Sequence, residues 1–142
     1  MMAKQGKLTY LDSDVLRTAF IGDQDISVEA MKIIDDPTRS FAASVYLELE
    51  LLPKPTFFKQ EIERQFFELF FDRVDVWAET SEELARQALE EAKKIGASAI
   101  DALHLVSAAQ AGAEELVTGE LDTRPLFRSN LVKVTSLRSS KV

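Results

Sequence analysis

The chain has 142 residues, of which 46% are apolar, and it carries a formal net charge of −7 with no cysteine and one histidine. This length suits one domain with its own core, which we place over residues 1–142. The composition excludes disulfides, thiolate zinc sites and a cysteine nucleophile. It also argues against a metal-free ribonuclease with two catalytic histidines, and against a protein that coats nucleic acid electrostatically.

The predicted secondary structure alternates between strands and helices. In chain order we expect a strand at 8–11, helices at 15–20 and 26–34, a strand at 40–44, helices at 45–52 and 56–71, a strand at 74–77, helices at 81–95 and 100–111, and strands at 115–118 and 131–135. This alternation predicts an α/β fold, a three-layer sandwich in which helices cover both faces of a central, mostly parallel sheet.

Cap and turn residues set the expected helix boundaries. Ser13 or Asp14 is expected to cap the first helix, and Gly22 to end it. Thr80 with Glu83 matches a capping box in front of the helix at 81–95.

The cellular location follows from what the sequence lacks. The N-terminal segment Met1–Lys7 is polar and has no apolar core of a signal peptide. No apolar run approaches the ~18 residues of a membrane span. We therefore expect a cytoplasmic protein with no membrane partner.

The helix expected at 56–71 carries more aromatic residues than one core-facing side needs. Aromatic and aliphatic residues recur at helical spacing along one face of this helix, and Phe57, Phe67 and Phe71 widen that apolar face. The surplus predicts a surface for a homodimer or another partner, while a deeply buried helix is an equally good interpretation.

Four acids from separate segments are expected at one edge of the sheet, because ligands bind beyond the carboxyl ends of parallel strands. Asp12 follows the first strand, and Glu120 follows the strand at 115–118. Glu50 lies in the helix after the second strand, and Asp101 lies in the first turn of the helix at 100–111.

Such a cluster needs a counter-ion. Two carboxylates ~5 Å apart repel by roughly 3 kcal/mol at an effective dielectric of ~20. A hard divalent cation with oxygen ligands, Mg²⁺ or Mn²⁺, removes that conflict and is suited to phosphodiester chemistry.

Each residue also has a purely structural interpretation. Ser98 with Asp101 is an ordinary helix start, Asp14 is more often a cap than a ligand, and His104 is more often a core histidine. One member of the pair Glu48 and Glu50 is expected in solvent. Solvent-facing positions are also expected for four acids on the long helices: Glu61, Glu63, Glu90 and Glu91.

Four segments resemble the motifs of PIN domains. The first is Leu8–Leu16 (LTYLDSDVL), and the second runs from Ser44 to Glu50 and Leu51. The third is Asp101–Ala108 (DALHLVSA), the most specific of the four, and the fourth is Leu116–Asp122 (LVTGELD). Their order and spacing fit, and they extend over nearly the whole chain.

The resemblance implies a Mg²⁺- or Mn²⁺-dependent endoribonuclease that cuts single-stranded RNA with metal-activated water, with the toxin of a toxin–antitoxin pair among the family's members. By position, the core metal ligands would be Asp12, Glu50 and Asp101, with Glu120 as a fourth catalytic acid and Asp122 as a further ligand. Ser13, Asp14 and Thr118 match supporting positions. The implied partners are single-stranded RNA, a cognate antitoxin and a second copy of the chain.

The fourth motif departs from the family pattern. Glu120 stands where the family has aspartate, and Thr123 stands where an aromatic residue is expected. An alternative is therefore a PIN fold that has lost catalysis and binds RNA or protein. A further alternative is a phosphatase of the haloacid dehalogenase type, since Asp12-Ser13-Asp14 fits that family's first motif.

Scattered cations near the same edge are expected to guide RNA, namely Lys54, Arg124 and Arg128. We expect products with a 5′-phosphate and a 3′-hydroxyl, because a cyclic phosphate calls for a pair of histidines.

Overall fold

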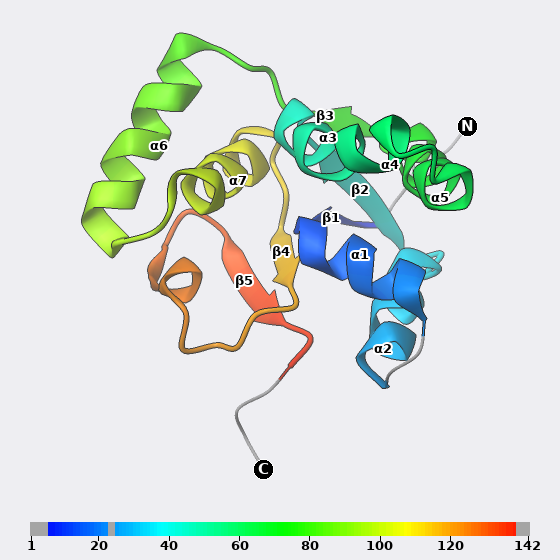
Figure 1. The fold of residues 1–142 in the computed structure, drawn as a ribbon. Coiled ribbons are helices and arrows are strands. Elements are labelled where there is room, and N and C mark those ends of the chain that lie inside the picture. The colour runs from blue at the N-terminus through cyan, green and yellow to red at the C-terminus, as the bar shows by residue number, and fades with distance from the viewer. Residues whose placement is uncertain (1–5, 23–24, 139–142) are drawn as a thin grey trace, which may run out of the picture.

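A computed structural model describes residues 6–22 and 25–138 of the chain (Figure 1), so the expectation for Met1–Gln5 lies outside the described residues. Five strands form one sheet in the order β3-β2-β1-β4-β5. The strands are β1 (Lys7–Leu11), β2 (Arg39–Ala43), β3 (Val76–Trp77), β4 (Glu115–Thr118) and β5 (Lys133–Ser136). Every neighbouring pair is parallel, which confirms the predicted type of sheet.

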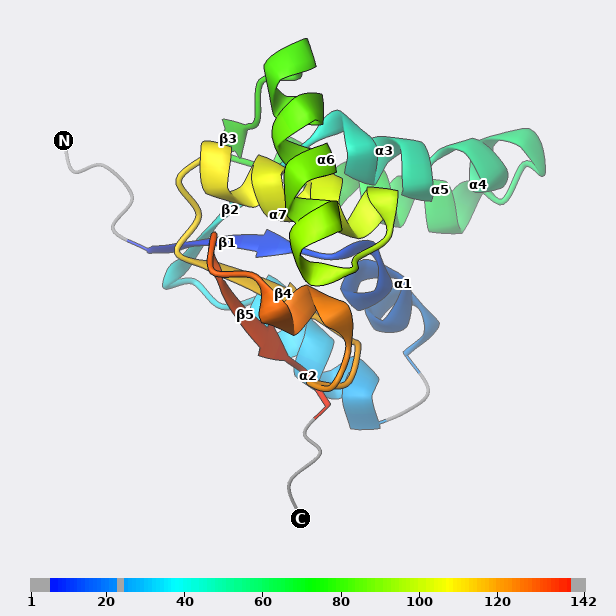
Figure 2. The same ribbon diagram turned by 90° about the vertical axis from the view of Figure 1, so that its left-hand side faces the viewer.

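Helices cover both faces of the sheet, as the three-layer prediction requires. They are α1 (Ser13–Ile21), α2 (Asp25–Ile34), α3 (Val45–Leu51), α4 (Pro53–Phe57), α5 (Glu61–Asp72), α6 (Glu82–Ile95), α7 (Ala99–Gln110) and a 3₁₀ turn, η1 (Pro125–Arg128). Figures 1 and 2 show α6 and α7 on one side of the sheet and α1 and α2 on the other.

The core forms where the two helical layers meet the central strands. Tyr10 and Leu11 of β1 are fully buried, and all four residues of β4 are buried, as expected for strands that are covered on both faces. Phe41 of β2 stacks edge-on against Phe70 of α5, with ring centroids 5.4 Å apart. Truncating a buried ring of this kind to alanine costs about 3–5 kcal/mol.

The prediction of a single helix at 56–71 is wrong. The segment forms α4 and α5, separated at Lys59, whose φ of 56° lies in the left-handed region. Pro53 starts α4 at a position where proline is tolerated, because the first helical N–H groups have no partner within the helix. The break was missed because a lysine, rather than a glycine, adopts the left-handed conformation.

Both interpretations of the aromatic residues apply, each to a different part of the segment. Phe67 and Phe71 are buried in the core. Phe57 is 78% exposed and contacts the Phe58 ring, and Phe58, Ile62 and Leu69 are exposed as well.

Other boundaries need small corrections. Asp12, rather than Ser13 or Asp14, caps α1, and Ser81 caps α6 by accepting a hydrogen bond from the Leu84 N–H, so the Thr80 and Glu83 capping box is wrong. The strands β3 and β5 begin two residues later than expected. Among the described residues, no helix is both long and apolar enough to cross a membrane.

Candidate metal centre

The site lies where the strand order changes direction. From β1 the chain moves outward to β2 and β3, and then returns to the other side of β1 as β4. In a parallel sheet such a switch leaves an open crevice beyond the carboxyl ends of the two central strands. Asp12 directly follows β1, and Gly119 directly follows β4.

Asp12 is fixed by both of its carboxylate oxygens. Oδ1 accepts a hydrogen bond from the Ser13 N–H at 2.8 Å, and Oδ2 accepts one from the Thr118 hydroxyl at 3.1 Å. The side chain is almost entirely buried, and this burial raises the pKa of the Asp12 carboxyl. The charge of Asp101 raises the pKa further, while His104 and the two hydrogen bonds lower it.

Glu50 is oriented by a chain of hydrogen bonds that starts in the core. His104 Nε2 lies 2.7 Å from Glu50 Oε1, and His104 Nδ1 lies 2.7 Å from the Tyr10 hydroxyl. That hydroxyl is also 2.6 Å from Ser44 Oγ, so Ser44 does not cap α3, whose N-cap position it occupies. Because an ionised carboxylate only accepts, Nε2 donates the hydrogen bond to Glu50.

The pKa of Glu50 reflects this arrangement. Burial raises the pKa, but the hydrogen bond and charge of His104, followed by Ser13 and Arg17, bring it below its ordinary value. Burial strongly raises the pKa of Tyr10, so its hydroxyl keeps its proton. One oxygen each from Asp12 and Glu50 and a ring nitrogen of His104 all lie within 4.8 Å of one another.

Asp101 approaches the same cluster from the first turn of α7. Ser98 caps that helix by accepting a hydrogen bond from the Asp101 N–H at 3.2 Å, which confirms the expected helix start. The Asp101 carboxyl is half-buried, and burial followed by the charge of Glu120 raises its pKa.

The loop after β4 carries Glu120 and is attached to α1. Asp14 Oδ1 accepts a hydrogen bond from the Gly119 N–H at 3.0 Å, and the Thr118 hydroxyl oxygen accepts one from the Glu120 N–H at 3.1 Å. A Cβ at Gly119 would lie 3.1 Å from Asp14 Oδ2, so this close approach favours glycine. Burial, and then the charge of Asp12, raises the pKa of Asp14 to about 6.

Other predicted site residues lie further out. Among the described residues, the group of ligand atoms within 4.8 Å of one another contains neither Asp101, Glu120 nor Asp122, and Asp122 is exposed. Glu120 Oε1 pairs with Arg124 Nε at 3.2 Å. Arg128 donates a hydrogen bond to the Ile95 carbonyl, and Lys54 is exposed on α4. The metal role of Asp122 stays a prediction.

These residues fit a divalent metal ion by their chemistry. The cluster offers carboxylate oxygens, and in the described part of the chain Asp12, Asp14 and Asp101 form no ion pair with lysine or arginine. Their raised pKa values show that burial and mutual repulsion oppose ionisation. A hard cation such as Mg²⁺ or Mn²⁺ would relieve both effects.

The arrangement of motifs around this cluster is that of a known family. A family model described as PIN domain matches residues 9–126. The chain belongs to the PIN domain family. The resemblance inferred from the sequence is confirmed, and the match goes against the phosphatase alternative. PIN domains are nucleases.

Solved structures with the same fold come from toxin–antitoxin systems. This PIN domain is similar to a chain of VapBC2 from Rickettsia felis bound to a promoter DNA fragment, at 17% identity and a TM-score of 0.67, over 91% of this chain and 98% of that chain. It is also similar to a chain of a toxin–antitoxin complex from Klebsiella pneumoniae, at 17% identity and a TM-score of 0.70, over 92% and 98% of the two chains. A third similar chain is in DNA-bound VapBC from Salmonella typhimurium, at 17% identity and a TM-score of 0.67, over 94% and 99%. No curated protein matches the chain.

The hydrogen-bonded support of the cluster was missed in the sequence. The burial expected for His104 is confirmed, since the residue is 1% exposed, but its ring also contacts Glu50. Asp101 and His104 are three residues apart on α7, and this spacing was the available signal, because it places both on one face of the helix. Nothing local to Tyr10 or Ser44 indicates their contact across 34 residues.

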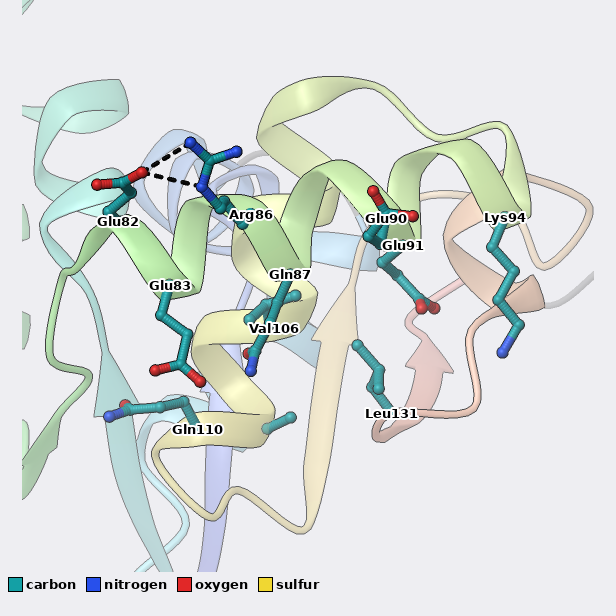
Figure 3. Close-up of a pocket in the computed structure, with 11 residues that line it drawn as sticks. Glu82, Glu83, Arg86, Gln87, Glu90, Glu91, Lys94, Val106, Gln110 and Leu131 are labelled. Carbon is teal, nitrogen blue, oxygen red and sulfur yellow. Dashed lines mark hydrogen bonds and ion pairs between the residues drawn. The ribbon is translucent and has the colours of Figure 1, made fainter.

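One cavity of this PIN domain lies away from the cluster. It is a groove of about 1,080 Å³ between α6 and α7, and it is lined by none of the cluster acids (Figure 3). In Figure 3 the Glu91 side chain extends from α6 toward the segment that carries Leu131. Glu91 is 7% exposed and accepts a hydrogen bond from Ser129 Oγ at 2.7 Å, so the expectation that it faces solvent is wrong. Glu61 and Glu90 are exposed as expected, whereas Glu63 is half-buried.

Proposed function

We propose that this PIN domain is an endoribonuclease that hydrolyses single-stranded RNA with the help of Mg²⁺ or Mn²⁺. The observation that carries the proposal is that one oxygen each of Asp12 and Glu50 lie within 4.8 Å of each other beyond the carboxyl end of β1. The charge of Asp101 acts on Asp12 from the first turn of α7. The absence of a paired lysine or arginine at Asp12 and Asp101, among the residues described, supports a bound cation.

Asp12, Glu50 and Asp101 would hold the metal, with Glu120 or Asp122 assisting. A divalent cation would lower the pKa of a water molecule bound to it and would neutralise the negative charge that develops on the phosphate. The chain positions the ligands: Ser13 and Thr118 fix Asp12, and His104 orients Glu50.

The same contacts bear on the products. Both ring nitrogens of His104 are engaged, by Glu50 and by Tyr10, so the one histidine is a positioning residue and not a free general acid or base. We therefore expect hydrolysis to leave a 5′-phosphate and a 3′-hydroxyl.

We also propose that the protein acts as the toxin of a toxin–antitoxin pair and binds a cognate antitoxin. The similar solved chains belong to toxin–antitoxin complexes, and this supports the proposal. A homodimer is supported by the exposed apolar side chains of Phe57, Phe58, Ile62 and Leu69. Sedimentation of the isolated chain tests the dimer, and a monomer at every concentration would count against it.

The central experiment incubates a 5′-labelled single-stranded RNA with purified protein and Mn²⁺. The wild type is expected to cut the RNA, and an Asp12→Asn/Asp101→Asn variant is expected to lose at least about 100-fold in rate. Glu90→Gln is the matched control, since it removes an exposed acid on α6. Equal cleavage by the wild type and the double variant would refute the proposal.

A second candidate function is a PIN fold that binds RNA or protein without cutting. It is favoured by the ion pair of Glu120 with Arg124, because the acid that departs from the family pattern is already partly neutralised. Stabilisation of the wild type by Mn²⁺ without RNA cleavage would support this candidate. Turnover that depends on the metal would exclude it.

A further inference from the structure

We propose that Arg17 and Arg138 bind two backbone phosphates of the RNA, one on each side of the phosphate that is cut. This inference rests on the proposed function and adds the path of the strand across the site. Neither arginine was among the cations expected from the sequence to guide RNA.

Arg17 is held at the rim of the cluster by neutral acceptors. Its Nη2 donates a hydrogen bond to the Glu50 backbone carbonyl at 2.7 Å, and its Nη1 donates to Ser13 Oγ at 3.4 Å. The side chain is exposed, and its charge contributes to the lowered pKa of Glu50. A guanidinium group is therefore fixed beside one predicted metal ligand and stays open to solvent.

Arg138 has the same kind of attachment on the loop that carries Glu120. Its Nε donates a hydrogen bond to the Gly119 carbonyl at 2.8 Å, and its backbone N–H donates to Ser136 Oγ at 2.9 Å. The Leu137 N–H donates to the Thr118 carbonyl at 2.8 Å, so the segment after β5 is joined to the loop by consecutive contacts. Arg138 is exposed, and its two terminal nitrogens make no other hydrogen bond with described residues.

These two arginines differ from the others in their charge balance. Among the described arginines, four are ion-paired with acids: Arg39, Arg64, Arg86 and Arg124. Within the described residues, the hydrogen bonds of Arg17 and Arg138 go only to carbonyl and hydroxyl oxygens, so neither guanidinium forms an ion pair, although the charge of Arg17 acts on nearby Glu50. Arg73 and Arg128 are also held by carbonyls, but those belong to Ile34 and Ile95 rather than to residues of the site.

The sheet order places the two arginines on opposite sides of Asp12. Arg17 contacts α3, which follows β2, whereas Arg138 follows β5 and contacts the loop after β4. Asp12 follows β1, which lies between β2 and β4. A strand laid over Asp12 from one arginine to the other therefore crosses the whole acid cluster.

The charge of the protein explains why such contacts are needed. A chain of net charge −7 with an acid cluster repels a polyanion at a distance. A guanidinium fork matches the oxygens of a phosphate and can bind it through two hydrogen bonds. Two fixed arginines would supply local attraction where the cluster alone repels.

The test measures binding of a fluorescent single-stranded RNA by anisotropy, with Ca²⁺ in place of Mn²⁺ to limit cleavage, at several salt concentrations. Arg17→Ala and Arg138→Ala are each expected to weaken binding by about fivefold to tenfold at low salt. Each is also expected to reduce the slope of log affinity against log salt by about 0.7, the value for one contact to a single strand. Arg86→Ala, an exposed arginine on α6, is the matched control and should change neither quantity.

Arg17→Lys separates a phosphate contact from a structural role, because it keeps the charge and loses the two-pronged attachment. We expect it to retain the salt slope of the wild type. A loss of slope equal to that of Arg17→Ala, or unchanged slopes in both alanine variants, would overturn the inference.

Two further measurements separate this inference from the proposed function. Cleavage kinetics with Mn²⁺ should place the loss for Arg138→Ala in KM rather than in kcat. If the wild type cuts RNA and both alanine variants cut it with the KM of the wild type, the arginine contacts are refuted while the proposed function stands. If the wild type neither cuts RNA nor gains thermal stability with Mn²⁺, the proposed function fails, whatever the anisotropy shows.

Discussion

The two ends of the sheet treat buried acids in opposite ways. At the amino end, Glu115 starts β4 and is 3% exposed, and its Oε1 pairs with Arg39 Nη1 at 2.9 Å and Lys7 Nζ at 3.1 Å. Burial raises the pKa of Glu115, but the nearby Thr135 hydroxyl and the contacts with Arg39 and Lys7 bring it down to about 2. At the carboxyl end, Asp12 is 7% exposed, and its pKa is raised.

The difference shows which acids serve the fold. Where a carboxylate is structural, the chain supplies its own cations, and the pair is stable without help from solvent. At the carboxyl end, Asp12, Asp14 and Asp101 face one another with no such cation among the described residues. A cation from outside the chain would supply the missing positive charge, as the proposed metal site requires.

The largest expected effect comes from neutralising one acid at each end. Glu115→Gln should lower the free energy of unfolding by about 3 kcal/mol, because Arg39 and Lys7 lose a buried partner. Asp12→Asn should leave it unchanged or higher in metal-free buffer, because a repelling charge is removed. Urea unfolding in EDTA measures the free energy of unfolding of both variants. Equal losses would show that the two ends of the sheet do not differ in how they stabilise buried acids.

Metal should act at one end only. Mn²⁺ at 100 times its dissociation constant should raise the free energy of unfolding of the wild type by about 2.7 kcal/mol. The gain should persist in Glu115→Gln and disappear in Asp12→Asn/Asp101→Asn. Thermal unfolding with and without Mn²⁺ gives the answer, and a gain retained in the double variant would place the metal elsewhere.

The pH dependence should also have opposite signs at the two ends. The pKa of Asp14 is raised from 3.8 to about 6, so its favourable contribution is complete below 3.8 and is lost as pH rises through 6. The metal-free wild type should therefore lose about 2 kcal/mol relative to Asp14→Asn between these pH values. Glu115 behaves in reverse, and its contribution is lost as pH falls from 4.5 through about 2.

Urea unfolding from pH 3 to 8 measures both trends. Glu115→Gln serves as the reference for the amino end, and Asp14→Asn as the reference for the carboxyl end. A constant difference between the wild type and Asp14→Asn across this range would show that Asp14 ionises normally.

The support of Glu50 should matter more to the metal than to the fold. Tyr10→Phe removes the hydroxyl between Ser44 and His104 and should lower the free energy of unfolding by about 1.5 kcal/mol. It should weaken Mn²⁺ binding by about tenfold, as is typical when the partner of a ligand is removed. Calorimetric titration with Mn²⁺ measures the binding, and Ser27→Ala on α2, which loses a hydroxyl bonded to the Thr18 carbonyl, is a control for loss of a hydroxyl.

The smallest effect is expected at Gly119. Gly119→Ala places a Cβ 3.1 Å from Asp14 Oδ2, and the neighbouring carboxylate has to shift by a few tenths of an ångström. We expect a loss of about 1 kcal/mol in the free energy of unfolding. Gly112→Ala is a poor control because its φ is 82°, so Ala113→Gly is the better comparison. An unchanged stability would show that Asp14 moves freely.

The sequence predicted the features that depend on local pattern. Alternating strands and helices gave the layers, and acids placed after strands indicated the edge at which Asp12 and Glu120 lie. Features that depend on distant partners were not predicted. Arg39 meets Glu115 across 76 residues, Ser129 meets Glu91 across 38, and no local periodicity encodes either contact.

Small errors in local structure have the same origin. The left-handed Lys59 ended α4 without a glycine or proline to mark it. Asp12 and Asp14 are equally suitable cap residues by type. Asp12 caps α1, whereas Asp14 accepts a hydrogen bond from the Gly119 N–H, a tertiary contact that the local sequence does not indicate.

The hydrogen-bonded chain from Ser44 through Tyr10 and His104 to Glu50 has a consequence for protein engineering. Transplanting Asp12, Glu50 and Asp101 onto another α/β scaffold would copy the ligands without the buried residues that aim one of them. A successful transplant has to carry the histidine of α7, the tyrosine of β1 and the serine that directly follows β2 as well. The smallest portable unit of this centre therefore includes three side chains that are almost fully shielded from solvent.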